Sequence, residues 1–75
     1  MFENLKKYLV EELNVAADNV TMDAELAGDL GINSLELADL VYICEEKFNI
    51  EIDDEYLHSF VTVGDVVRYL EENAK

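Results

Sequence analysis

The sequence predicts an all-α protein, namely a small four-helix bundle with a short third helix and a long loop between the first two helices. Apolar residues recur at helical spacing in several segments, and proline is absent. The chain has 75 residues, which allows one small domain over residues 1–75. Hydrophobic residues make up 51% of it, far too many for a disordered acidic tail, so we expect a packed core.

The first expected helix covers about residues 2–14. One apolar stripe runs along it at helical spacing, formed by Phe2, Leu5, Leu9 and Leu13. Residues 15–33 then lack a helical period and carry Asp, Asn and Gly, which are typical of turns. This long segment also holds five apolar side chains, so we expect it to lie across the core. They are Val20, Met22, Leu26, Leu30 and Ile32.

The second expected helix begins at Ser34 and ends near Phe48. Asn33 is a favourable N-cap, and Glu36 stands where a capping-box acid reaches back. A short third helix over about residues 54–59 follows Asp53, a candidate cap.

The last expected helix covers about residues 63–73. Thr62 and Asp65 have the spacing from N-cap to N3 of a capping box, with Asp in place of the usual Glu or Gln.

The chain is strongly acidic. Eighteen Asp and Glu against five Lys and Arg give a formal net charge of −13. This charge argues against nucleic acid and against anionic membrane surfaces as partners. The carboxylates concentrate in the middle of the chain, since residues 8–46 contain no Lys or Arg. We therefore expect partners with basic surfaces.

Other sequence features narrow the class of protein. No apolar stretch approaches the roughly 20 residues of a membrane span, so we expect no membrane insertion. The single cysteine, Cys44, cannot form an internal disulfide, which favours a reducing cytoplasm. The count of Cys and His predicts no metal cluster. A calcium-binding loop is the first rival interpretation, but residues 49–55 have too few alternating ligands and no glycine.

The expected second helix carries two apolar stripes. The first faces the core and contains Leu37, Leu40, Val41, Cys44 and Phe48. The second lies on the opposite side, among carboxylates, and contains Leu35, Ala38 and Tyr42. A bundle helix needs one buried face, so the second stripe is either a docking surface for a partner or an area covered by the long loop.

Residues 29–37, with the sequence Asp-Leu-Gly-Ile-Asn-Ser-Leu-Glu-Leu, resemble the modification site of acyl carrier proteins. The pattern of that family is Gly-x-Asp-Ser-Leu at the start of the second helix. The resemblance extends over essentially the whole chain, through the long loop, the acidic second helix and the Thr62-Val63-Gly64-Asp65 segment.

The resemblance implies that the chain is a carrier and not an enzyme. In this family a phosphopantetheinyl transferase esterifies the serine, here Ser34, with 4′-phosphopantetheine from coenzyme A. The thiol of the arm then holds acyl intermediates as thioesters and delivers them to partner enzymes. The expected partners are acyl-transfer, ketosynthase or ligase-type enzymes of fatty-acid, polyketide or related biosynthesis, with basic docking patches. The carrier itself is expected to be a monomer.

The resemblance also assigns residues to partner binding and to an acyl pocket. The expected partner-binding residues are Leu35, Glu36, Ala38, Asp39, Tyr42, Glu45 and Glu46. The expected pocket lies between the second, third and fourth helices, although ordinary packing would also explain its candidates: Leu40, Cys44, Ile52, Leu57, Phe60, Val66 and Tyr69. The bulk of Leu57 and Phe60 would restrict the pocket to short chains.

Asn33 departs from the family pattern, which has Asp directly before the serine. Asn caps a helix as well as Asp does, so the fold is unaffected. The lost charge affects loading, because Asn is a poorer ligand for the hard cation that assists transfer of the arm. A carrier fold without the arm, acting as an acidic interaction or regulatory module, is therefore the second interpretation.

Overall fold

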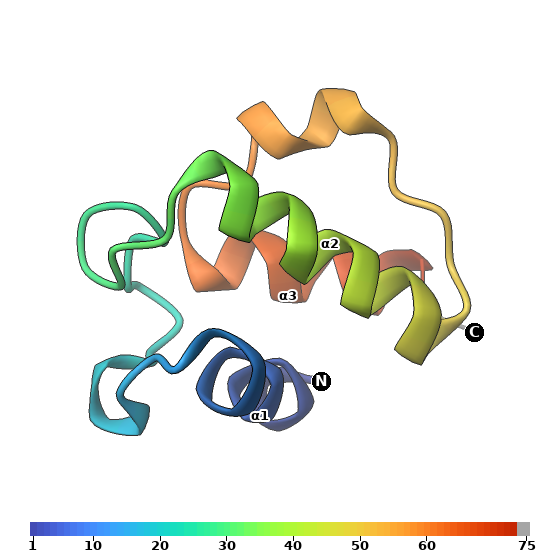
Figure 1. The fold of residues 1–75 in the computed structure, drawn as a ribbon. Helices are drawn as coiled ribbons and strands as arrows, with labels where there is room; N and C mark the ends of the chain where they lie inside the picture. The colour runs from blue at the N-terminus through green and yellow to red at the C-terminus, as the bar shows by residue number, and fades with distance from the viewer. Residues whose placement is uncertain (74–75) are drawn as a thin grey trace.

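Three α-helices and two short 3₁₀ helices form the structure, a computed structural model that describes residues 1–73 (Figure 1). The α-helices are α1 (Phe2–Leu13), α2 (Ser34–Phe48) and α3 (Val63–Asn73), and the 3₁₀ helices are η1 (Ala17–Asn19) and η2 (Asp54–His58). Lys75, one of the five basic residues, lies outside the described residues. The all-α prediction is confirmed, since residues 1–73 contain only an isolated bridge and no strand.

The expected short third helix is present, but it is a 3₁₀ helix and not an α-helix. Its hydrogen bonds span three residues, as in the 2.9 Å bond that the Ser59 N–H donates to the Tyr56 carbonyl. Ile52 and Phe60, which flank this segment, are both buried. Asp53 occupies the N-cap position, as expected, although its side chain makes no capping hydrogen bond.

An asparagine in the left-handed conformation ends both α1 and α2. α1 ends at Leu13, one residue before the expected end, because Asn14 adopts a left-handed conformation with φ 58°. Asn49 ends α2 in the same way, with φ 56°. Asparagine enters this region at a lower cost than most residues, and both chain reversals follow from that property.

The core lies where the three α-helices meet, and the long loop closes it from one side. Fully buried residues come from each helix: Leu5 and Leu9 in α1, Leu40 and Cys44 in α2, and Val63 and Leu70 in α3. The loop adds buried Val20, Leu26 and Ile32, as expected for a segment that lies across the core. Leu30 is half-buried and packs against the core. Met22 is the exception, since it is 40% exposed.

A short pairing between the long loop and the start of α3 fixes the loop in place. Glu25 and Thr62 form an isolated antiparallel bridge. On either side of it, the Leu26 N–H donates to the Val61 carbonyl at 2.8 Å, and the Val63 N–H donates to the Ala24 carbonyl at 2.9 Å. The loop therefore has a defined path up to the beginning of α2.

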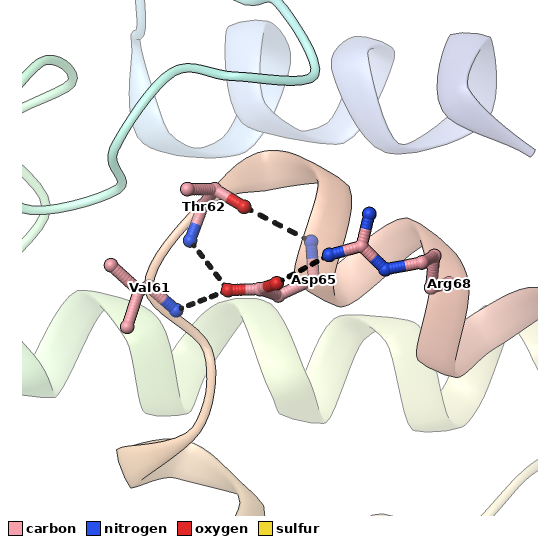
Figure 2. A network of polar contacts seen from close by, with 4 residues as sticks. All are labelled: Val61, Thr62, Asp65 and Arg68. Carbon is pink, nitrogen blue, oxygen red and sulfur yellow. Dashed lines mark hydrogen bonds and ion pairs between the residues drawn. The ribbon is translucent and has the colours of Figure 1, made fainter.

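A polar network holds the first turn of α3 (Figure 2). Asp65 Oδ2 accepts hydrogen bonds from the N–H groups of Val61 and Thr62, each at 3.0 Å. In return, the Asp65 N–H donates to Thr62 Oγ1 at 3.2 Å, which confirms the predicted capping box. Asp65 Oδ1 lies 2.6 Å from Arg68 Nη2.

Candidate functional site

Ser34 is the first residue of α2 and is exposed at the end of the long loop. The residue before it, Asn33, is extended and caps the helix: its Oδ1 accepts the Glu36 N–H at 2.8 Å. Glu36 Oε1 accepts the Asn33 N–H at 3.1 Å, so the predicted capping box is complete. Asn33 thus provides the carbonyl oxygen that a capping Asp would provide.

The capping box leaves part of the helix end free for an anion. The first N–H groups of an α-helix have no acceptor within the helix. In α2 the box satisfies those of Asn33 and Glu36, and the two between them belong to Ser34 and Leu35. These N–H groups and the positive end of the helix dipole favour a phosphate group beside the Ser34 hydroxyl.

The loop before Ser34 is held by its own hydrogen bonds. Asp29 Oδ2 accepts the Glu25 N–H at 2.8 Å, and the Ile32 N–H donates to the Leu26 carbonyl at 2.9 Å. Gly31 has φ 67°, a conformation that glycine adopts without strain. Buried Ile32 then anchors the chain two residues before the serine, which presents Ser34 at a defined position.

A groove of about 250 Å³ opens beside Ser34. It runs between the long loop, the first turn of α2 and the segment just before α3. Its apolar lining includes Leu26, Ile32, Leu37 and Phe60.

Phe60 is the pocket candidate from the sequence that lines this groove. Leu40, Cys44, Ile52 and Val66 are buried in the core, and Leu57 and Tyr69 are half-buried. An acyl pocket formed by the seven candidates stays a prediction. Burial raises the pKa of the Cys44 thiol to about 12, so Cys44 is a neutral core residue.

The second apolar stripe of α2 is open to solvent. Leu35 is 79% exposed and Tyr42 is 61% exposed, and Ala38 between them is exposed as well. The alternative interpretation, in which the long loop covers this stripe, is therefore wrong. A large aliphatic and a large aromatic side chain on one exposed helix face are typical of an interaction surface.

The four acidic residues of α2 that the sequence assigns to partner binding differ in their surroundings. Asp39 and Glu46 are exposed, and Glu46 raises the pKa of the Tyr42 hydroxyl through hydrogen bonding and charge. Glu36 and Glu45 are half-buried, and each also serves the fold. Glu36 completes the cap described above, and Glu45 Oε2 accepts the Ile52 N–H at 2.9 Å. Sequence reasoning missed this second role, because the Ile52 N–H lies seven residues away from Glu45.

Other kinds of site have little support in the described residues. The histidine, His58, is exposed in η2 and does not line the groove beside Ser34. In the part of the chain that the structure describes, no three His, Cys, Asp or Glu side chains are grouped to hold a metal ion. No helix of residues 1–73 is long and apolar enough to cross a membrane.

Comparisons with known proteins show the family to which the chain belongs. The profile of a family described as the phosphopantetheine attachment site matches residues 3–70. The chain is 49% identical to an acyl carrier protein of Helicobacter pylori strain J99 over 73 residues, which cover 97% of this chain and 94% of that protein. It is 48% identical to an acyl carrier protein of Wolinella succinogenes, and the match covers 97% of this chain and 96% of that protein.

The fold has a close counterpart among solved structures. The crystal structure of an acyl carrier protein from Thermotoga maritima superimposes with a TM-score of 0.83 at 21% identity and covers 93% of this chain and 81% of that one. At this identity the likeness shows the fold, while the family follows from the sequence matches. The chain belongs to the acyl carrier protein family, whose members bear phosphopantetheine and are carriers and not catalysts.

Proposed function

We propose that Ser34 carries the 4′-phosphopantetheine arm, and that acyl intermediates are held on its thiol as thioesters. The observation that carries this proposal is the exposed Ser34 hydroxyl directly after the capping box of α2. Ser34 follows Gly31 at the spacing of the family's attachment motif. The free N–H groups of Ser34 and Leu35 favour the phosphodiester that the arm would create there.

A separate enzyme carries out the attachment. The Ser34 oxygen forms a bond to the phosphorus that bears the pantetheine arm in coenzyme A. The diphosphate bond of coenzyme A breaks, and adenosine 3′,5′-bisphosphate is the leaving group. The proton of the hydroxyl must leave during this step, so a general base is needed. His58 does not line the Ser34 groove, and we therefore assign the base to a phosphopantetheinyl transferase.

The exposed stripe of α2 is the proposed docking surface for that transferase and for later partners. Leu35 and Tyr42 provide apolar anchors, and Asp39 and Glu46 provide exposed negative charge beside them. With a net charge of −13, the chain attracts enzymes with basic patches and speeds their encounter at low salt. Ala38, between the two anchors, leaves room for a partner side chain. Glu36 and Glu45 add charge at the border of the surface.

Fatty-acid biosynthesis is the typical role of the family, and we propose it for this chain. The partners would be acyl-transfer, ketosynthase or ligase-type enzymes that meet the arm at the α2 face. We place this activity in the cytoplasm, where a chain with a single cysteine stays reduced. The seven pocket candidates from the sequence stay a prediction within this proposal.

Intact-mass measurement of the protein isolated from its native host tests the proposal. We expect the added mass of one phosphopantetheine arm, or of the arm with an acyl group. Peptide mapping should place this mass on Ser34, and a Ser34→Ala variant expressed in the same host should lack it. An unmodified chain in growing cells would contradict the proposal and favour a carrier fold that acts without the arm.

A docking experiment tests the α2 surface separately. Binding of the loaded protein to a ketosynthase is measured for Leu35→Ala and Tyr42→Ala. Met22→Ala is the control, because Met22 is also 40% exposed but lies outside α2 and does not line the groove beside Ser34. We expect the two α2 variants to bind at least tenfold more weakly, as for anchors at the centre of an interface. Unchanged binding would contradict this surface.

A further inference from the structure

A groove of about 260 Å³ lies between η2 and α3. Among the described residues that line it, Phe60 alone also lines the groove beside Ser34. The other lining residues belong to η2, to the residue after it and to α3: Tyr56, Ser59, Asp65, Arg68, Tyr69 and Glu72. Tyrosine and arginine are among the residue types that most often dominate binding energy at protein interfaces. The groove is therefore a candidate for a second interaction surface.

Three aromatic rings of this groove pack against one another. Tyr56 and Tyr69 lie 4.7 Å apart between ring centroids, and Phe60 meets Tyr69 edge-on at 5.6 Å. Phe60 is 6% exposed and belongs to the core, but Tyr56 remains 42% exposed. An aromatic ring that is held by its neighbours and open to water offers contact area to a partner at a small cost in conformational entropy.

The packing of the rings decides what kind of cation they can bind. An aromatic cage needs rings that stand around a free space, whereas the rings of Tyr56 and Tyr69 contact each other. A compact ammonium group therefore has no cage to enter. A guanidinium is planar and more weakly hydrated, so it can stack on the exposed part of the Tyr56 ring.

The charged residues of the groove favour a cation. Arg68 Nη2 lies 2.6 Å from Asp65 Oδ1, so these two charges compensate each other (Figure 2). Asp65 Oδ2 is also occupied, because it accepts two backbone N–H groups just before α3. Glu72 is exposed and adds a second carboxylate, which leaves the groove with a net negative charge. A carboxylate can accept two parallel hydrogen bonds from a guanidinium.

The surroundings of the groove are acidic as well. Burial raises the pKa of the Tyr69 hydroxyl, and Tyr56, followed by the charges of Asp53 and Glu45, raises it further. The whole chain has a net charge of −13. Anionic ligands and a second copy of this chain are therefore repelled, whereas a basic partner is attracted.

The groove also matches an arginine side chain in size. Such a side chain consists of about seven groups of the size of a water molecule, each ~30 Å³, and fills on the order of 210 Å³. The groove has a volume of about 260 Å³, so an arginine fills most of it.

We propose that the groove between η2 and α3 is a second interaction surface, which takes an arginine side chain of a partner protein. The guanidinium stacks on Tyr56 and pairs with Glu72, and the aliphatic stem of the arginine lies along the aromatic rings. This surface is separate from the exposed stripe of α2, so a basic partner that uses both is held at two places. The inference does not depend on an arm at Ser34, and it is therefore tested on the unloaded chain.

An NMR titration of the isotopically labelled full chain tests this inference. The probe is the blocked peptide acetyl-Gly-Arg-Gly-amide, and the same peptide with citrulline, a neutral analogue of arginine, or with lysine is used for comparison. We expect the arginine peptide to shift the signals of Tyr56, Tyr69 and Glu72 with a Kd on the order of 1 mM. Nuclear Overhauser contacts should join its side chain to the Tyr56 ring. The lysine peptide should bind about two- to fivefold more weakly, since it keeps the charge but not the planar group.

Variants of the two contact residues separate the ring from the carboxylate. Tyr56→Leu keeps apolar bulk without the ring and should weaken the arginine peptide about two- to fivefold, while Tyr56→Phe should bind it like wild type. Glu72→Gln should weaken binding by about twofold or more. Glu71→Gln is the matched control, because Glu71 is an exposed carboxylate of α3 that does not line the groove, and it should bind like wild type.

Several outcomes would overturn the inference. Equal affinity for the arginine and citrulline peptides would show that charge has no part in binding. Equal affinity for the arginine and lysine peptides, or an equal loss in Glu71→Gln and Glu72→Gln, would show general attraction to an acidic chain. Shifts that are confined to α2 would show that the groove between η2 and α3 is not a binding surface for arginine.

Discussion

Replacement of Asp65 by alanine measures how much this side chain stabilises the start of α3. The segment just before α3 also forms one wall of the Ser34 groove. The carboxylate accepts hydrogen bonds from the N–H groups of Val61 and Thr62, each at 3.0 Å, and pairs with Arg68 at 2.6 Å. Asp65 therefore contributes to stability through hydrogen bonds to the backbone and through an ion pair, and we expect these two contributions to differ in size. The variants Asp65→Ala and Arg68→Ala separate them.

The hydrogen bonds to the backbone should dominate. Loss of a side chain that caps a helix costs about 1 kcal/mol, with a range of about 0.5–2 kcal/mol. An exposed ion pair contributes only about 0–1 kcal/mol, and the Arg68 side chain is 63% exposed. We expect Asp65→Ala to lower the free energy of unfolding by about 1–2 kcal/mol, and Arg68→Ala to lower it by less than about 0.5 kcal/mol. For a domain of this size, each 1 kcal/mol corresponds to about 4–8 °C in Tm.

The effect of Asp65 depends on pH with a defined sign. The hydrogen bond from the Thr62 N–H, followed by the bond from Val61 and the charge of Arg68, holds the pKa of Asp65 below its ordinary value of 3.8. The folded state therefore binds fewer protons than the unfolded state, and the stabilisation is complete above the unfolded pKa. It is lost as pH falls through the lower, folded pKa. The difference in stability between wild type and Asp65→Ala should be constant near neutral pH and shrink in this acidic range.

Urea unfolding of the three proteins, followed by circular dichroism, provides the measurement. A loss in Arg68→Ala as large as that in Asp65→Ala would refute the reasoning, because the ion pair would then dominate. If the difference in the free energy of unfolding between wild type and Asp65→Ala does not change with pH, the role of the ionised carboxylate is contradicted.

Three further predictions concern a close backbone contact, loading and charge. In Gly64→Ala, the added Cβ would lie 2.9 Å from the Met22 carbonyl oxygen. Such overpacking destabilises the folded state by about 1–3 kcal/mol, whereas alanine in place of glycine stabilises a helix by ~1 kcal/mol. The Tm of this variant should therefore fall below that of wild type in thermal unfolding. Gly28→Ala meets only the side chain of Glu25 and serves as the matched control, and an equal fall in both variants would contradict the contact. Asn33→Asp should speed attachment of the arm, followed by intact mass over time, because a carboxylate binds a hard cation better than an amide; equal rates would refute this. Moderate salt should raise Tm by screening the self-repulsion of a chain with net charge −13, and a Tm that is flat from low to moderate salt would count against it.

Local patterns in the sequence predicted the three α-helices and both capping boxes correctly. Asn33 with Glu36, and Thr62 with Asp65, are three residues apart, so each box depends on short-range geometry that the sequence contains. The exposed stripe on α2 was also visible in the helical period. The structure excluded cover of this stripe by the long loop, because Leu35 is open to solvent, and docking of a partner there stays a proposal.

Contacts between distant residues could not be predicted in this way. The bridge between Glu25 and Thr62 joins segments far apart in the chain, and the bond from Ile52 to Glu45 depends on how the chain turns after α2. The 3₁₀ geometry of η2 was missed because a short run of helix-compatible residues fits either hydrogen-bond pattern.

Loading of the purified chain with the arm tests the central claim most directly. Wild type and Ser34→Ala are incubated with coenzyme A and a phosphopantetheinyl transferase, and the intact mass of each is measured. We predict the added mass of one arm on wild type and none on Ser34→Ala. A wild-type chain that stays unmodified under conditions that load another acyl carrier protein, or a Ser34→Ala variant that is modified equally, would contradict Ser34 as the attachment site.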